Sequence, residues 1–270
     1  MITHNGKYLL HATHHGMPIY AATMGGKIVI GFSLLSATRQ AIVAAFGSAE
    51  GTEVIRKTND YLNRIATTDP QRALQISAFI NEDPLLVTSL VETSKVRTLD
   101  GDGFAYINTN FKPTADIPFE IVYHSYFVKN STRQIEGWNE NQWWGINGNG
   151  SSFGQNGSGS AFVEGELNEI VISYSGTGNT PISLNGNRAG NPGFVSTDFH
   201  AFHINGWNNE CMRDRRCDIK IVEGTTTVRE MYPFIRNGEN GMLDIISGTF
   251  YPNANTEGSF TIALTDKTTS

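Results

Sequence analysis

The pattern of apolar and polar positions changes twice along the chain. Residues 1–32 alternate in short apolar runs with glycine-containing turns between them (KYLLHATHHG, MPIYAATMGG, KIVIGF), which predicts a small β meander. Residues 33–94 carry apolar residues at helical spacing, and residues 95–270 return to period-two alternation with glycine-rich turns. We therefore predict two regions: an N-terminal region over residues 1–95 and a mainly β region over residues 96–270.

The helical segment 33–94 carries its own boundary signals. Gly47 is a predicted C-cap, and Thr52 is a candidate N-cap for the next helix. Asp69-Pro70 and Asp83-Pro84 each place an acidic N-cap before a proline at the first helical position. Helices this short cannot bury a large core alone, so they need the strands before them, the domain after them or another chain.

The C-terminal region reads as strands. FEIVYHSYF, Phe119 to Phe127, alternates between two sets of positions, and LNEIVISYS, PISLNGN, FHAFHING, CDIKIVEG and TTTVREMY follow with a similar period of two. Asn185-Gly186 and Glu223-Gly224 are placed as hairpin turns. Strands at this spacing predict a two-sheet sandwich, so the expected fold is mainly β with a small N-terminal α/β zone of short helices.

Composition excludes several function classes. The 28 glycines and the charged fraction of 17 % fit a β-rich domain with polar turns, and a net charge of −6 argues against a nucleic-acid partner. No apolar run reaches the ~18–20 residues of a membrane span. The nearest secretory-signal candidate starts only at Gly25, so we expect use without Sec export. Cys211 and Cys217 either close a small disulfide loop or remain reduced thiols.

Two runs frame the β region. LDGDGFAYINTNFKPT spans Leu99 to Thr114, and YPFIRNGENGMLDIISGTFYPNANTEGSF spans Tyr232 to Phe260. Together they resemble a concanavalin A-like, laminin-G-like jelly-roll family that is frequent in phage structural proteins and in surface proteins of gut bacteria. The resemblance covers about residues 97–263 and implies that the first and last strands lie side by side, so that both runs close the sheet. The matching positions are Gly103 to Thr109, Arg236, Gly241 to Asp244, Phe250 to Asn253 and Gly258 to Phe260.

The start of the chain, MITHNGKYLLHATHHGMPIYAAT, resembles the start of proteins from phage and prophage structural regions of gut Bacteroidales. This likeness implies a virion protein, assembled in the host cytoplasm, that serves as capsid decoration, head fibre or tail appendage. Its N-terminal region would dock on other virion proteins, the chain would form a homo-oligomer, and no cofactor is implied.

The segment GWNENQWWGINGNGSSFGQNGSG, Gly137 to Gly159, sets tryptophans among amides. Flat aromatic rings stack on sugar C–H surfaces while amides bond the hydroxyls, so these residues are candidates for binding a host-surface glycan. The alternative is that neighbouring Trp143 and Trp144 face opposite sides of a strand, which puts at least one in the core. The candidate residues are Trp138, Trp143, Trp144 and Trp207, with Asn141 and Asn208.

Catalytic and metal patterns are weaker. Glycoside hydrolases of this sandwich type use Glu-x-Asp-x-(x)-Glu on one strand, whereas Glu164, Glu166 and Glu169 lack the central aspartate and fall out of phase. The DGDG stretch, Asp100 to Gly103, resembles part of a calcium loop but lacks its distal ligands. We therefore predict a non-enzymatic protein without a metal site. A free bacterial glycan-binding module is the alternative, and a glycoside hydrolase is the weaker one.

Overall fold

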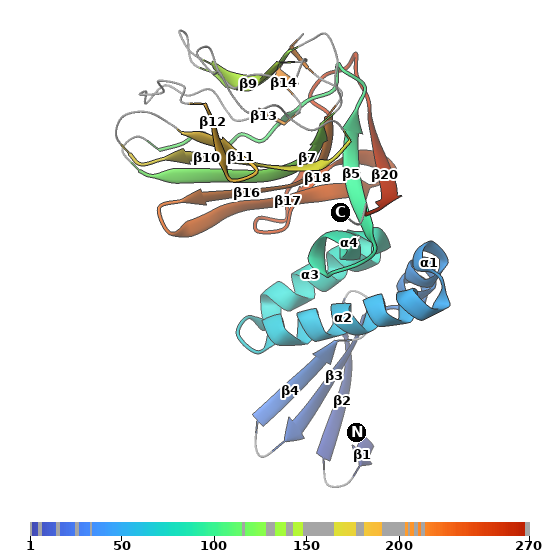
Figure 1. Ribbon diagram of the computed structural model, residues 1–270. Helices are drawn as coiled ribbons and strands as arrows, with labels where there is room; N and C mark the ends of the chain where they lie inside the picture. The colour runs from blue at the N-terminus through green and yellow to red at the C-terminus, as the bar shows by residue number, and fades with distance from the viewer. Residues whose placement is uncertain are drawn as a thin grey trace. The chain divides into compact units, whose positions relative to one another are not determined.

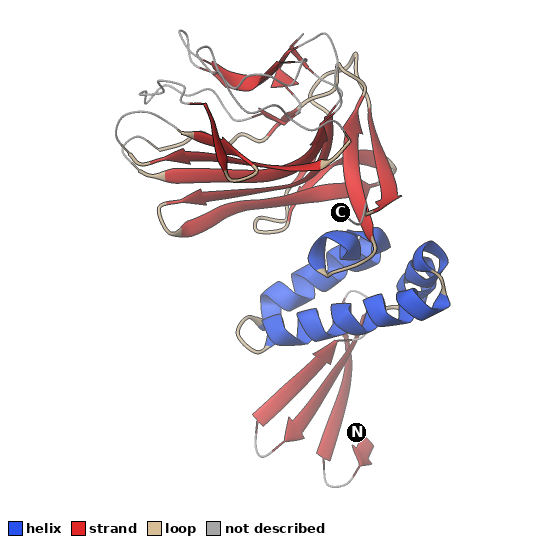
Figure 2. Ribbon diagram, in the orientation of Figure 1, coloured by secondary structure: helices blue, strands red, loops and turns tan. Residues whose placement is uncertain are grey.

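The computed structural model divides the chain into two compact units, Met1–Lys95 and Val96–Ser270 (Figure 1). Among the described residues, every helix belongs to the N-terminal unit (Figure 2). For some segments the structure describes only the backbone and not the side chains. These segments are the described parts of residues 2–32, 127–147, 188–190, 206–210 and 214. The structure describes residues 2–4, 7–14, 17–24, 27–32, 34–114, 117–127, 133–138, 143–147, 165–176, 181–190, 203–204, 206–207, 210–211 and 214–267.

The described backbone before residue 33 forms a four-stranded antiparallel sheet in the order β1-β2-β3-β4. Each strand pairs with the next along the chain, which is the connectivity of a meander. The strands are β1 (Ile2–His4), β2 (Lys7–His14), β3 (Met17–Met24) and β4 (Lys27–Phe32).

The helices after residue 33 start and stop largely where their caps predict. Gly47 ends α1 as expected, and the Asp69 carboxylate accepts a 2.9 Å hydrogen bond from the Arg72 amide as an N-cap of α3. The prediction for Thr52 is wrong: α2 already begins at Ser48, because Gly47 flanks both helices and leaves no loop before Thr52. The helices are α1 (Ser36–Phe46), α2 (Ser48–Ala66), α3 (Pro70–Glu82), the 3₁₀ turn η1 (Pro84–Leu86) and α4 (Val87–Leu90).

The segment that opens at Asp83-Pro84 is shorter than its pattern predicts. Pro84 does start a helical turn, but the Asp83 side chain makes no capping hydrogen bond, and α4 ends at Leu90. Of the helices described, none combines the length and the apolar character that a bilayer crossing requires.

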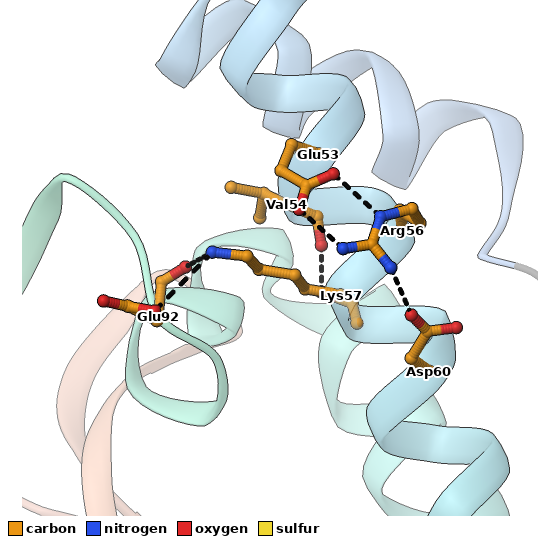
Figure 3. A network of polar contacts seen from close by, with 7 residues as sticks. Glu53, Val54, Arg56, Lys57, Asp60 and Glu92 are labelled. Atoms are coloured by element: carbon orange, nitrogen blue, oxygen red, sulfur yellow. Dashed lines mark hydrogen bonds and ion pairs between the residues drawn. The ribbon is translucent and has the colours of Figure 1, made fainter.

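The exposed face of α2 carries a network of charged side chains (Figure 3). The Arg56 guanidinium lies 2.6 Å from carboxylates of both Glu53 and Asp60, one turn away on either side (Figure 3). Lys57 donates to the Glu92 carbonyl at 3.2 Å. Exposed pairs of this kind contribute little stability, but they leave Arg56 and both of its carboxylates already engaged.

The C-terminal unit is built on one large antiparallel sheet. Within its described residues the strand order is β12-β11-β10-β7-β16-β17-β18-β19, with β5 and β20 joined off this path. The strands are β5 (Lys95–Gly101), β6 (Ile107–Asn108), β7 (Phe119–Phe127), β8 (Arg133–Trp138), β9 (Trp143–Asn147), β10 (Leu167–Tyr174), β11 (Ile182–Leu184), β12 (Asn187–Gly190), β13 (His203–Ile204), β14 (Gly206–Trp207), β15 (Glu210–Cys211), β16 (Asp214–Glu223), β17 (Thr226–Arg236), β18 (Glu239–Asp244), β19 (Phe250–Pro252) and β20 (Phe260–Asp266).

Period-two alternation explains the core of this unit. Along β7, Ile121 and Tyr123 are buried, whereas Glu120, which belongs to the opposite face of the strand, is exposed. Ile107 of β6 and Ile204 of β13, which pair in a separate small sheet, join the same apolar cluster. The unit is therefore sandwich-like, and the prediction of a mainly β chain with a few short helices is confirmed.

The large sheet forks at β16. β7 pairs along one edge of β16, from Asp214 to Glu223, while β17 occupies the other edge only as far as the pair Ile219–Met231. Beyond that point β5 takes the place of β17 and pairs with Arg215 and Arg216. β5 in turn pairs with β20, so the first and last strands of this unit lie side by side, as expected.

Candidate functional site

Asp102 joins the two runs that frame the C-terminal unit. One carboxylate oxygen accepts hydrogen bonds from the amides of Phe104 and Ala105, at 2.9 and 3.1 Å. The other accepts from the Ser259 amide at 2.6 Å and from its hydroxyl at 3.0 Å. A single side chain in the first loop therefore holds the backbone that leads into the last strand.

Asn253 makes the reciprocal connection from the C-terminal run. Its carbonyl oxygen accepts from the Tyr106 amide at 3.1 Å, and its NH₂ group donates to the Gly258 carbonyl at 2.7 Å. Asn255 adds a 2.8 Å bond from its NH₂ group to the carbonyl of Phe104. We call Asp102, Asn253 and Asn255 the closure cluster, because their side chains satisfy backbone groups of both runs.

Two further features of the closure cluster follow from this packing. Burial alone would raise the pKa of the Asp102 carboxyl, but hydrogen bonds from the Phe104 and Ser259 amides, the Ser259 hydroxyl and the Ala105 amide hold it below its usual value. At Gly258, an added Cβ would lie 2.3 Å from the Ala105 nitrogen, so only glycine allows the two loops to approach this closely.

The other framing positions are structural as well. The buried Asp244 carboxylate accepts from the amides of Glu230 and Ile246, each at 3.0 Å, and so fixes the turn after β18. The Arg236 guanidinium lies over the rings of Phe234 and Phe250, at 5.3 and 5.6 Å from their centroids. The residues that carry the sequence resemblance thus hold the sandwich together.

A second cluster of polar side chains spans three strands on the outer face of the large sheet. His124 of β7 lies between Asp218 of β16 and Glu169 of β10. Its Nδ1 is 2.7 Å from an Asp218 carboxylate oxygen, and its Nε2 is 3.5 Å from a Glu169 carboxylate oxygen. The Asp218 carboxylate also accepts a hydrogen bond from the backbone amide of His124, at 3.2 Å. We call these three residues the histidine cluster.

The histidine cluster is electrostatically biased toward the protonated ring. The hydrogen bond to Asp218, with the negative charges of Asp218 and Glu169, raises the pKa of His124 above its ordinary value despite partial burial. Both ring nitrogens face carboxylates, so the ring is engaged in joining strands. When protonated, the ring attracts both carboxylates and so holds β10, β7 and β16 together. We call this arrangement a proton-linked clamp.

The predicted glycan residues lie largely outside the described part. Asn141 and Asn208 are not described, and neither are the side chains of the four tryptophans. The described backbone places Trp138 opposite Trp143 in the β8–β9 ribbon and Trp144 opposite Gly137. Trp207 belongs to another ribbon, where it pairs with Glu210. The backbone therefore brings Trp138 and Trp143 to partner positions.

The residues weighed for catalysis and metal binding occupy separate places. Glu166 lies before β10 and Glu169 within it, and Glu164 is not described. Asp100 accepts from the Thr98 hydroxyl at 2.5 Å and from Arg215 Nε at 3.1 Å. In the described part of the chain, no three His, Cys, Asp or Glu side chains are grouped to hold a metal ion.

Both cysteines, Cys211 and Cys217, are buried, and neither forms a disulfide. Cys217 is the extra residue of a β-bulge in β16, between Arg216 and Asp218. Neither thiol is joined to the other, so the disulfide loop that the spacing allowed is not formed.

Sequence reasoning missed the histidine cluster. His124 and Asp218 are 94 positions apart, and each reads as an ordinary polar position on a strand. The one usable signal was that both fall on the outward positions of strands with buried alternate residues.

No protein-family model matches this chain, and a search of curated proteins finds no similar sequence.

Replacing Asp102 with alanine tests the closure cluster. We expect Asp102→Ala to lower the free energy of unfolding of the C-terminal unit by about 2 kcal/mol, because backbone amides at Phe104, Ala105 and Ser259 lose their acceptor. Denaturant titration followed by tryptophan fluorescence measures this, since all four tryptophans lie after residue 96. Glu257→Ala, an exposed change in the same loop, is the control; equal stability of the two variants would contradict the role of Asp102.

The raised pKa of His124 predicts a pH-dependent contribution to stability. The contribution is complete below the ordinary pKa of 6.5 and is lost as pH rises through the raised value in the folded protein. We expect His124→Gln to lower the free energy of unfolding by about 1 kcal/mol at about pH 6 and by much less at about pH 9. Glu120→Gln on the same face is the control, and a deficit independent of pH would refute the proton-linked clamp.

Proposed function

We propose that this chain is a non-enzymatic structural protein of a phage virion, a capsid decoration, head fibre or tail appendage. In this proposal residues 1–95 form a small α/β anchoring unit, and residues 96–270 form a concanavalin A-like jelly roll that is displayed on the particle. The particle is assembled in the host cytoplasm, and the chain acts without a cofactor.

The observation that carries the proposal is the use of the framing residues. Asp102, Asn253 and Asp244, which belong to the runs that resemble the jelly-roll family, all bind backbone groups. The resemblance therefore concerns the architecture of the domain. The hydrogen bonds to the backbone account for these side chains without a catalytic role. A display module that must survive outside the cell needs a firmly closed sandwich more than it needs a reactive site.

The N-terminal unit fits an anchoring role by its size. Among its described residues, the buried apolar ones are Leu34 and residues of the helical segment that follows, and an isolated core of this extent is marginal by itself. Association with neighbours, including further copies of the chain, would bury more apolar surface and stabilise the unit. The partners in this proposal are other virion proteins, and the chain is a homo-oligomer.

Weak adhesion to host-surface glycans is the second part of the proposal. The pairing of Trp138 with Trp143 brings two aromatic residues to partner positions of one ribbon, which supports the proposal that they stack on a sugar. Many copies on one particle would convert weak single-site affinity into strong attachment. The same pairing favours the alternative function, a free bacterial glycan-binding module outside any virion.

The number of copies per particle tests the virion proposal. We expect quantitative mass spectrometry of purified particles from the source that encodes the chain to detect it. Tens to hundreds of copies would indicate a head component, and a few to a few tens would indicate the tail. Absence from particles would overturn the proposal and leave the free glycan-binding module in its place.

Glycan binding is tested separately with tryptophan variants. On a glycan array we expect binding by the wild-type chain and a loss of at least about tenfold for Trp143→Ala, because stacking on each ring contributes strongly to sugar affinity. Trp144→Ala, which pairs with Gly137 instead of Trp138, is the matched control and should lose less. Binding that is absent from the wild type, or unchanged in Trp143→Ala, would remove the tryptophan site.

A further inference from the structure

An open groove of about 500 Å³ lies between α1 and α2 in the N-terminal unit. Its volume is in the range of surface pockets that accept ligands and peptide side chains. The two helices meet closely beside it: a Cβ added at Gly51 of α2 would lie 2.7 Å from the Cα of Val43. The residues that line the groove are Ser36, Arg39, Gln40, Val43, Ala44, Thr52 and Ile55.

The floor of the groove is apolar and its rim is polar. Ile55 is buried, Val43 is half-buried, and Ala44 is exposed, so apolar surface is open to water along one side. An apolar strip bounded by polar groups is the usual form of a site that receives a partner's side chain.

One cation on this rim, Arg39, has no counter-ion among the residues that the structure describes. Arg39 is exposed, and among the described residues its guanidinium makes no hydrogen bond or ion pair. The residues that line the groove include no carboxylate. Elsewhere on α2, by contrast, Arg56 is bound by both Glu53 and Asp60 (Figure 3). The charge of Arg39 is thus available to a partner.

We infer that this groove is the surface through which the N-terminal unit docks on a neighbouring virion protein. It receives a segment in which a bulky apolar side chain stands next to an aspartate or glutamate. The apolar side chain covers Val43, Ala44 and Ile55, and the carboxylate pairs with the planar guanidinium of Arg39. This inference rests on the proposed function and names the chemistry of the anchoring partner.

The charge pattern argues against a second copy that docks through its own α2. A second copy presenting its own α2 would bring Glu53 and Asp60, but both of these carboxylates already bind Arg56. A partner segment with an uncommitted carboxylate pairs with Arg39 without first breaking an ion pair.

The first experiment uses the purified full-length chain and a displayed library of random peptides. We expect enrichment of peptides with Asp or Glu beside Leu, Ile, Met, Phe or Trp. Their affinity should fall at least about tenfold for Arg39→Glu and for Ala44→Trp, which fills the exposed side of the groove. Lys220→Glu, an exposed site in the other unit with the same change of charge, should bind as the wild type does. No enrichment, enrichment without acidic residues, or full binding by Arg39→Glu would overturn the inference.

The second experiment separates this inference from the proposed function. Particles are produced with each variant, and the copies per particle are counted. Packaging of the wild type and of Lys220→Glu, but not of Arg39→Glu or Ala44→Trp, supports the docking groove. Equal packaging of all variants overturns the groove while the virion role stands. If the wild type is absent from particles, the virion role falls, and with it the virion partner.

Discussion

The polar contact between the loop after β5 and the loop before β20 is the constraint on which the sandwich depends. Asp102 and Ser259 are 157 positions apart, and Tyr106 and Asn253 are 147 apart. Bringing such distant segments together costs chain entropy, which only contacts present in the closed state can offset. The closure cluster supplies these contacts and satisfies backbone groups that the turning chain would otherwise leave without partners.

The fork in the large sheet explains why closure needs side chains at all. β5 meets β16 at only two described positions, Asp100 with Arg215 and Leu99 with Arg216, so the ladder between these two strands is short. Arg216, buried at this fork, lies 3.9 Å from the centroid of the Tyr123 ring. The neighbouring pair of Arg215 with Asp100 adds a second contact at the fork. The strand that begins the sandwich is thus joined to β16 by side chains as well as by this short ladder.

In the N-terminal unit, most of the charged side chains on α2 that are named above are paired with one another. On α2, Arg56 and its neighbouring carboxylates neutralise one another, and Lys57 is turned to Glu92. Pairs this exposed stabilise the helix only slightly, but they decide which charges remain for a partner. Arg39, on the preceding helix α1 and beside apolar surface, is the charge that remains at the groove among the described residues. In the proposed virion role, the closed sandwich is the part that is displayed, and the helical surface is the part that associates with a neighbour.

Local patterns determined much of this fold from the amino-acid sequence. Alternation in β7, the caps at Gly47 and Asp69, and the two runs that meet at β5 and β20 were predictable, because each depends on neighbours in sequence or on a stereotyped motif. The start of α2 was predicted wrongly at Thr52, since one glycine flanks two helices. Only the tertiary structure decided that His124 meets Asp218 and Glu169, and that Arg39 borders an apolar groove. These sites join residues through strand register and helix packing, and no local pattern encodes either one.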